Sequence, residues 1–135
     1  MYDIKALYEA ENVQDAIRLL TEHPQAQIIA GGSDVLVQIR EGKRAGVELV
    51  SIYGLDELRG VSLEEDETLR IGSLTSFSHI TKNELIQKYI PVLGEAVDMV
   101  GGPQIRNIGT IGGNVCNGAV SADSAPTLFS LNAML

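Results

Sequence analysis

The chain has 135 residues, 44% of them hydrophobic, and its eighteen acidic and ten basic side chains give a formal net charge of −8. A chain of this length forms one domain, or most of one, and can bury a real core. The acidic charge argues against a nucleic-acid-binding function, since no basic stripe is available to displace phosphate counterions.

The composition also disfavours a metal centre, a membrane span and secretion. Cys116 is the single cysteine, which excludes an internal disulfide and a cysteine cluster, and His23 and His79 stand apart from other ligand types. No apolar run approaches the roughly 18 residues of a membrane span. The first residues mix in acids where a secretory signal is basic and then apolar. We therefore expect a cytoplasmic protein without a membrane span, and any redox metal on another chain.

A helix is the first element that the sequence predicts, over residues 13–22. Asn12 followed by Asp15 resembles a capping box at its start, with Asp in place of the usual Glu. His23 and Pro24 end the pattern. The helix presents one apolar face with the i, i+3, i+4, i+7 spacing, made by Val13, Ala16, Ile17 and Leu20.

A βαβ unit is expected next. Residues 26–30 form a short apolar strand that runs into two glycines, and Ser33 then serves as the N-cap of a helix that ends near Gly42. Residues 47–52 form the second parallel strand. Glycines at a strand-to-helix turn are typical of phosphate-binding loops.

The second part of the chain has a different character. Two strands, 58–63 and 68–71, flank the acidic turn 64–67 and predict an antiparallel hairpin. We therefore place a boundary near residue 54 and expect an α+β protein, with a small βαβ subdomain over 1–54 and a second α+β subdomain over 55–135. Helices are predicted at 76–82, at 84–89, from Pro91 to the pair Gly101 and Gly102, and at 124–131.

A glycine-rich stretch from Gly101 to Asp123 is expected to form a long loop. It holds six of the fourteen glycines and only two charged residues, Arg106 and Asp123. A glycine-dense, nearly uncharged segment suits the binding of a large anion through main-chain N–H groups. The end of the chain is apolar to its last residue, which favours a polypeptide that stops partway through a larger fold.

Each candidate binding residue also has a purely structural interpretation. Gly31 and Gly32 form either a simple turn or, with the N–H groups of Ser33 and Asp34, a phosphate site. The segment 110–114 is either a structural glycine loop or a second anion site. Asp123 is either an N-cap or an acceptor for sugar hydroxyls.

Other residues receive no assigned chemistry. Arg106 is a phosphate partner, a salt bridge or an interface residue, with no ranking among the three. We expect Cys116 to be a small buried hydrophobe. No nucleophile with a base, no carboxylate pair and no metal cluster is present, so a bound cofactor would perform any chemistry. The aromatic residues are assigned to packing: Tyr2, Tyr8, Tyr53, Tyr89, Phe77 and Phe129.

Two motifs together resemble the FAD-binding subunit of molybdenum hydroxylases, the family of xanthine, nicotinate and carbon monoxide dehydrogenases. The motifs are Ile28-Ile29-Ala30-Gly31-Gly32-Ser33-Asp34 and Pro103-Gln104-Ile105-Arg106-Asn107-Ile108-Gly109-Thr110-Ile111-Gly112-Gly113-Asn114. The similarity covers the whole chain, and the stretch from Cys116 to Pro126 looks closest to bacterial xanthine dehydrogenase-type subunits. Members of that family are considerably longer, so the FAD-binding fold here is expected to be C-terminally incomplete.

The resemblance implies which residues bind the cofactor and which partners this chain has. A molybdopterin-binding large subunit and a small subunit with 2Fe-2S clusters would pass electrons to FAD, and FAD would reduce NAD or another acceptor. Two alternatives are a fragment of an enolpyruvyl-reductase-like flavoenzyme and a non-catalytic assembly module. The implied FAD-binding residues are Ile28, Ile29, Ala30, Gly31, Gly32, Ser33, Asp34, Thr110, Ile111, Gly112, Gly113, Asn114 and Asp123.

Overall fold

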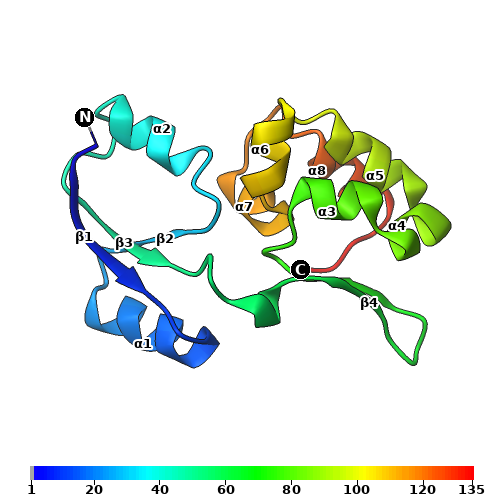
Figure 1. Ribbon diagram of the computed structural model, residues 1–135, viewed down its shortest axis with the longest axis horizontal. Helices are drawn as coiled ribbons and strands as arrows, with labels where there is room; N and C mark the ends of the chain where they lie inside the picture. The colour runs from blue at the N-terminus through cyan, green and yellow to red at the C-terminus, as the bar shows by residue number, and fades with distance from the viewer. Residues whose placement is uncertain (1) are drawn as a thin grey trace. The chain divides into compact units, whose positions relative to one another are not determined.

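A computed structural model describes residues 2–135 of the chain. Helices and strands are mixed, in agreement with the predicted α+β class (Figure 1). The chain divides into two compact units between Glu57 and Leu58, next to a single turn of 3-10 helix, η1 (Asp56–Leu58). Each unit has its own hydrophobic core.

The first unit is built on a three-stranded parallel sheet in the order β1-β3-β2. Its α1 and α2 cover opposite faces of this sheet (Figure 1), as expected when right-handed crossovers run in opposite directions. The predicted β2–α2–β3 unit is confirmed, whereas β1 was not predicted. The elements in chain order are β1 (Ile4–Glu9), α1 (Val13–Glu22), β2 (Gln27–Ile29), α2 (Val35–Arg40) and β3 (Val47–Ser51).

The central strand β3 supplies the most deeply buried residues of this unit. Leu49 lies opposite Leu7 of β1, and Val50 lies opposite Ile28 of β2. Leu49 and Val50 are buried, while Leu7 and Ile28 on the edge strands are exposed. Three buried residues, Ile29, Ile39 and Leu49, join β2, α2 and β3 in one hydrophobic core.

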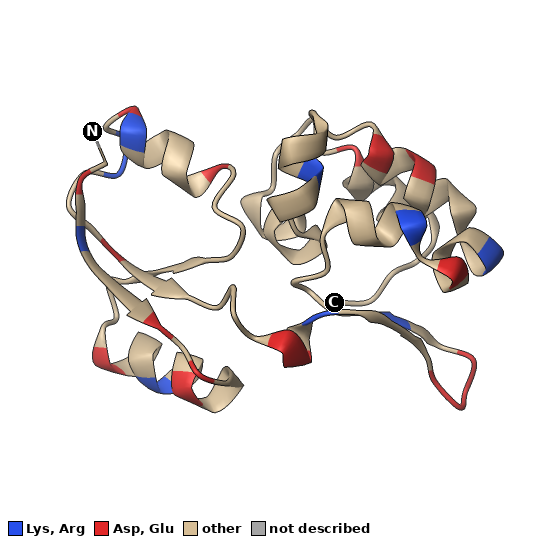
Figure 2. Cartoon of the chain, in the orientation of Figure 1, with Lys and Arg blue, Asp and Glu red and all other residues tan. Residues whose placement is uncertain are grey.

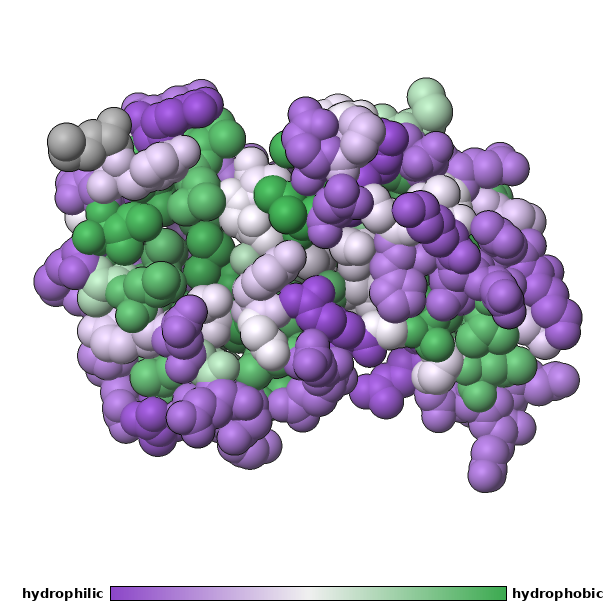
Figure 3. All heavy atoms as spheres, viewed as in Figure 1, coloured by the Kyte–Doolittle hydropathy of each residue, from purple (hydrophilic) through white to green (hydrophobic). Residues whose placement is uncertain are grey.

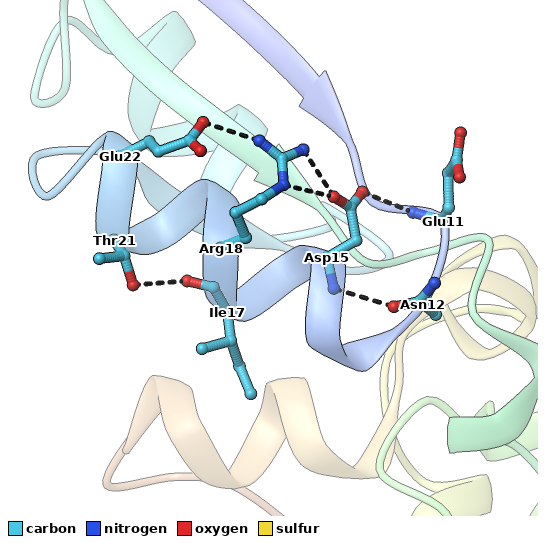
Figure 4. Close-up of polar contacts among 7 residues, drawn as sticks. All are labelled: Glu11, Asn12, Asp15, Ile17, Arg18, Thr21 and Glu22. Atoms are coloured by element: carbon cyan, nitrogen blue, oxygen red, sulfur yellow. Dashed lines mark hydrogen bonds and ion pairs between the residues drawn. The ribbon is translucent and has the colours of Figure 1, made fainter.

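The start of α1 matches the capping pattern only in part. Asn12 Oδ1 accepts a hydrogen bond from the Asp15 N–H at 2.9 Å, as an N-cap does. The Asp15 carboxylate, however, accepts from the N–H of Glu11 at 3.1 Å rather than from that of Asn12 (Figure 4). Arg18 then bridges Asp15 and Glu22 along the helix surface.

Ser33 does not cap α2, which corrects the prediction. Asp34 occupies the N-cap position and makes no capping hydrogen bond with its side chain. Its carboxylate instead accepts a hydrogen bond from Gln38 Nε2, one turn later. The physical reason is that α2 begins one residue later than predicted, so Ser33 lies in the preceding turn.

The second unit combines a two-stranded antiparallel hairpin with a group of short helices. Its core contains Phe77, Ile80, Ile86, Leu93, Val97 and Ile111. Pro91 is the first residue of its helix, as predicted. The elements in chain order are β4 (Val61–Leu63), β5 (Leu69–Ile71), α3 (Phe77–Lys82), α4 (Glu84–Tyr89), α5 (Pro91–Asp98), α6 (Pro103–Ile108), α7 (Ile111–Asn117) and α8 (Ser124–Ser130).

The predicted long loop over 101–123 is wrong, because this stretch contains α6 and α7. Gly101, at φ +48, turns the chain after α5, and Pro103 then begins α6 rather than merely ending the helix before it. Thr110 caps α7, and Gly118 ends it in the left-handed conformation at φ +62. The glycine-rich stretch is therefore largely helical.

The hairpin is attached to the helices through buried Thr75. The Thr75 hydroxyl accepts a hydrogen bond from the Gly60 N–H at 2.9 Å and donates to the Gly60 carbonyl at 3.0 Å. The turn between the strands carries the predicted acidic side chains, which are exposed (Figure 2). None of the helices over residues 2–135 has the length and the apolar character needed to cross a membrane.

Candidate cofactor-binding site

The turn after β2 has the backbone geometry of an anion site. In a parallel sheet, ligands bind beyond the carboxyl ends of the strands, and Ala30–Asp34 occupy this position. Gly32 adopts φ +74, a conformation that favours glycine, and a Cβ there would lie 3.1 Å from Leu36 Cδ1 and 3.2 Å from Ile29 Cδ1. The sequence therefore needs glycine at 32 for the turn itself.

The N–H groups of this turn are available to a ligand. Within residues 2–135, the backbone N–H groups of Gly31, Gly32, Ser33 and Asp34 donate to no other group. Successive unpaired N–H groups attract an anion. The Asp34 carboxylate, the one negative charge in the turn, is engaged by Gln38. A diphosphate, with several acceptor oxygens, fits this set of donors.

The second motif is arranged differently, because most of its N–H groups are already used inside the second unit. Gly112 donates to the Ser73 carbonyl at 2.9 Å, and Ile111 donates to the Thr75 carbonyl at 3.0 Å. The Gly113 N–H donates to Thr110 Oγ1 at 3.1 Å. Backbone donors at 111–113 therefore hold α7 in place in this structure.

Asp123 and Asn114 are the members of the second group whose polar atoms remain available. Asp123 stands at the N-cap position of α8 but makes no capping hydrogen bond, and its side chain is exposed. Asp123 is therefore the N-cap of α8 by position, but its carboxylate accepts no hydrogen bond from the first turn. Asn114 Oδ1 accepts a hydrogen bond from Ser124 Oγ at 2.5 Å, which leaves the Nδ2 end of the amide as a donor.

Arg106 has a structural role. It donates to the carbonyls of Val100 at 3.2 Å and Gly101 at 2.8 Å, and its Nε lies 3.3 Å from Asp98 Oδ1. Of the three possibilities that the sequence left open, the structure shows the salt bridge, combined with carbonyl binding where α5 ends.

Two expectations about other side chains are wrong. Cys116 is exposed on α7 rather than buried. Of the aromatic residues assigned to packing, Phe129 on α8 is 88% exposed, and Tyr2, Tyr53 and Tyr89 are exposed as well. Cys116 and Phe129 lie on short helices that bury little of their surface: the buried residue of α7 is Ile111, and that of α8 is Ser124.

The structure places the candidate residues in two groups, one in each unit. Residues 28–34 belong to the first unit, and residues 110–114 with Asp123 belong to the second. Sequence reasoning missed Ser73 and Ser124, which contact the second motif. Neither has a local signal, because each meets the motif only through folding. Residues 2–135 contain no group of three or more side chains that could hold a metal ion.

Comparison with known proteins gives matches over nearly the whole chain. A family model described as the FAD binding domain in molybdopterin dehydrogenase matches residues 2–135. The chain is 47% identical to the xanthine dehydrogenase FAD-binding subunit of Escherichia coli O157:H7, over 96% of this chain and 44% of that protein. It is 33% identical to the nicotinate dehydrogenase FAD-subunit of Eubacterium barkeri, over 93% of this chain and 43% of that protein.

A solved structure shares the fold. Carbon monoxide dehydrogenase from Hydrogenophaga pseudoflava superimposes with a TM-score of 0.83 and 30% identity, over 87% of this chain and 41% of the matched chain. The chain thus spans less than half the length of the curated relatives that it matches.

Proposed function

This chain belongs to the family of FAD-binding domains of molybdopterin dehydrogenases, and we propose that it is the FAD-binding portion of a xanthine dehydrogenase-like molybdenum hydroxylase. One observation of the structure supports this most directly: the four unpaired N–H groups of Gly31–Asp34 at the carboxyl end of β2. When bound, FAD supplies the electron-transfer chemistry that the side chains of this chain lack.

The roles of the candidate residues follow from their available atoms. The N–H groups of Gly31–Asp34 and the Ser33 hydroxyl bind the diphosphate, and Ile28–Ala30 line the same side. Asn114 donates through Nδ2, and the exposed Asp123 carboxylate accepts from sugar hydroxyls. Thr110, Ile111 and Gly112 act indirectly, by holding α7 where Gly113 and Asn114 can meet the cofactor.

The partners that we propose follow from the names of the relatives, which are FAD-binding subunits of xanthine and nicotinate dehydrogenases. A molybdopterin-binding large subunit oxidises the substrate, and a small subunit with 2Fe-2S clusters relays the electrons to this subunit. NAD or another acceptor then receives them. We place the assembly in the cytoplasm as part of this proposal.

FAD titration of the full chain tests the proposal, with riboflavin as the comparison ligand. Riboflavin lacks both the diphosphate and the adenosine, so FAD is expected to bind more tightly, and the variants of the turn after β2 isolate the part due to the diphosphate. Ser33→Asp places a carboxylate among the diphosphate donors and should weaken FAD binding by roughly tenfold or more. The binding of riboflavin should not change.

Two control variants separate the turn from general effects of charge. Ser33→Ala removes only the hydroxyl and should weaken FAD binding less than Ser33→Asp does. Thr21→Asp adds the same charge to α1 of the same unit, on an exposed residue, and should leave FAD affinity unchanged. Equal affinities for FAD and riboflavin, or equal effects of the two aspartates, would contradict the proposed role of the turn.

A structural role in assembly is the second candidate function for the second motif. It comes into consideration because the Ile111, Gly112 and Gly113 N–H groups are bonded within the unit and so are not available to the phosphates of a cofactor. Gly113→Asp discriminates between the two functions. Loss of flavin binding supports a cofactor role, whereas loss of partner-subunit binding with unchanged flavin binding supports assembly.

A further inference from the structure

The buried hydroxyl of Ser124 is directed to one residue of the candidate site. Ser124 is the first residue of α8 and is fully buried, at 0% exposure. Its Oγ donates a hydrogen bond of 2.5 Å to Asn114 Oδ1, on α7. A buried hydroxyl is costly unless it is paired, so this contact fixes how the Asn114 side chain is held.

The contact also decides which end of the Asn114 amide is available. A side-chain amide has an acceptor at one end and two donor hydrogens at the other. Because Ser124 occupies Oδ1, the Nδ2 end remains, and it donates to no group within residues 2–135. No buried side-chain polar atom of the described chain lacks a partner. The unpartnered Nδ2 must therefore reach the surface.

The same hydrogen bond ties together the two ends of a segment that carries another candidate residue. Asn114 and Ser124 flank residues 115–123, in which Gly118 ends α7 at φ +62. Asp123, with its exposed carboxylate, directly precedes Ser124. Ser124 thus anchors both the Asn114 donor and the residue next to the Asp123 acceptor.

We propose that Ser124 is a positioning residue, whose buried hydroxyl holds the Asn114 amide with Nδ2 directed outward so that it donates to an anionic oxygen of the bound nucleotide diphosphate. This inference rests on the proposed function. Without the Ser124 hydroxyl, the Asn114 amide can rotate or present its oxygen, which repels an anion. One oriented hydrogen bond of this kind changes affinity by roughly threefold to tenfold.

A double-mutant cycle on the full chain tests whether Ser124 acts through Asn114. FAD affinity is measured by flavin fluorescence for Ser124→Ala, Asn114→Ala, the double variant and Ser124→Thr. We expect Ser124→Ala to weaken binding, Ser124→Thr to restore it, and the double variant to bind no more weakly than Asn114→Ala alone. Losses that simply add would overturn the proposal.

A stability control separates positioning from unfolding. Thr81→Val removes a half-buried hydroxyl that donates to the Phe77 and Gly94 carbonyls and does not bond to α7 or α8. It should lower the melting temperature of the second unit and leave FAD affinity unchanged. If Thr81→Val weakens FAD binding as much as Ser124→Ala does, the effect of Ser124 is one of general stability.

Side-chain amide NMR tests the orientation without any flavin. The Asn114 NH2 resonances, identified by their loss in Asn114→Ala, should shift in Ser124→Ala and return in Ser124→Thr. Asn107, whose Oδ1 accepts from Ser78 Oγ at 2.7 Å, serves as the matched control and should not shift. Unchanged Asn114 resonances in Ser124→Ala would overturn the proposal.

Inorganic pyrophosphate distinguishes failure of this inference from failure of the proposed function. If the wild-type chain binds no FAD, the proposed function fails. A Ser124-dependent shift of the Asn114 NH2 resonances on adding pyrophosphate would still support the positioning role. Pyrophosphate shifts that are equal in the wild type and in Ser124→Ala would refute it.

Discussion

At the scale of single residues, Gly112 shows how closely α7 approaches the segment before α3. A Cβ at Gly112 would lie 2.7 Å from both the Cβ and the carbonyl oxygen of Ser73. The Gly112 N–H donates to the same carbonyl. Glycine is therefore needed here for packing of the chain against itself, whatever the ligand.

Replacing Gly112 by Ala is expected to destabilise the second unit by about 1–3 kcal/mol, the usual cost of overpacking. Gly94→Ala in α5 is the matched control, because a Cβ there meets Ile86 Cγ2 at an ordinary 3.5 Å. It should be neutral or stabilise by about 0.5–1 kcal/mol through helix propensity. Denaturant unfolding measures both variants, and equal stability of the two would contradict this account of Gly112.

At the scale of elements, the start of α1 is held by hydrogen bonds around one carboxylate. Asp15 accepts from the Glu11 N–H and from Arg18, while the Asn12 side chain accepts from the Asp15 N–H (Figure 4). The hydrogen bond from Glu11 first, and the Arg18 guanidinium second, lower the pKa of Asp15 below its usual range. A carboxylate in the first turn also complements the helix dipole.

This lowered pKa predicts how the stability of α1 depends on pH. Because the pKa of Asp15 is lowered in the folded state, its ionised carboxylate stabilises the fold at pH values above the usual pKa range of an aspartate. The contribution is lost as the pH falls through the lowered pKa. In Asp15→Asn, the free energy of unfolding of the first unit should therefore fall less steeply as the pH is lowered.

Arg18→Gln offers a graded version of the same test. It removes the second cause and keeps the hydrogen bond from Glu11, so the pKa of Asp15 should rise and still lie below its usual range. NMR titration of the Asp15 carboxyl measures this directly, and added salt should shrink only the Arg18 part. The prediction would be contradicted if the pKa of Asp15 in the wild-type protein lay in the usual range of an aspartate.

At the scale of the whole molecule, a large negative charge coexists with exposed apolar surface. The net charge of −8 opposes association. On the face shown in Figure 3, apolar side chains gather over the first unit, whereas polar ones cover most of the second. The last helix and the residues near it also expose apolar side chains, at Val120, Phe129, Met134 and Leu135.

We expect Phe129 to contribute strongly to the binding of a hydrophobic dye by the second unit, because at 88% exposure it is the most exposed aromatic side chain described there. Phe129→Ser should lower the fluorescence of bound dye while changing stability by no more than about 0.5 kcal/mol. Ile17→Ser, at an exposed apolar position of α1 in the first unit, is the control. Equal dye binding by the wild type and Phe129→Ser would show that the exposed ring does not contribute.

Much of the fold was predictable because its signals are local. The apolar spacing over 13–22, the Pro at position 91 and the acidic turn at 64–67 each act within a few residues. The βαβ unit and the hairpin followed from them. The family was also predictable, because the two motifs are short, contiguous and far from random composition. The cofactor-binding roles of residues 28–34, 110–114 and Asp123 stay predictions.

Local signals failed where contacts distant in sequence decide the structure. Strand β1 pairs with β3 about forty residues later and is mostly exposed, so no burial pattern marks it. Helix α7 contains two glycines, which disfavour helix on propensity, yet Thr110 and the carbonyls of Ser73 and Thr75 hold it. The Thr110 cap is local in sequence, whereas the two carbonyls reach α7 only on folding.

The sequence by itself determined the class of the fold, the family and the two segments that carry the motifs, because those depend on residue order within short stretches. The tertiary structure decided which polar atoms in the motifs form hydrogen bonds within the protein and which remain available to a ligand. It engaged the N–H groups of Ile111–Gly113 and left those of Gly31–Asp34 unpaired. The physical reason is that each buried N–H must find an acceptor, and the acceptors of Ile111 and Gly112 lie on a segment almost forty residues away.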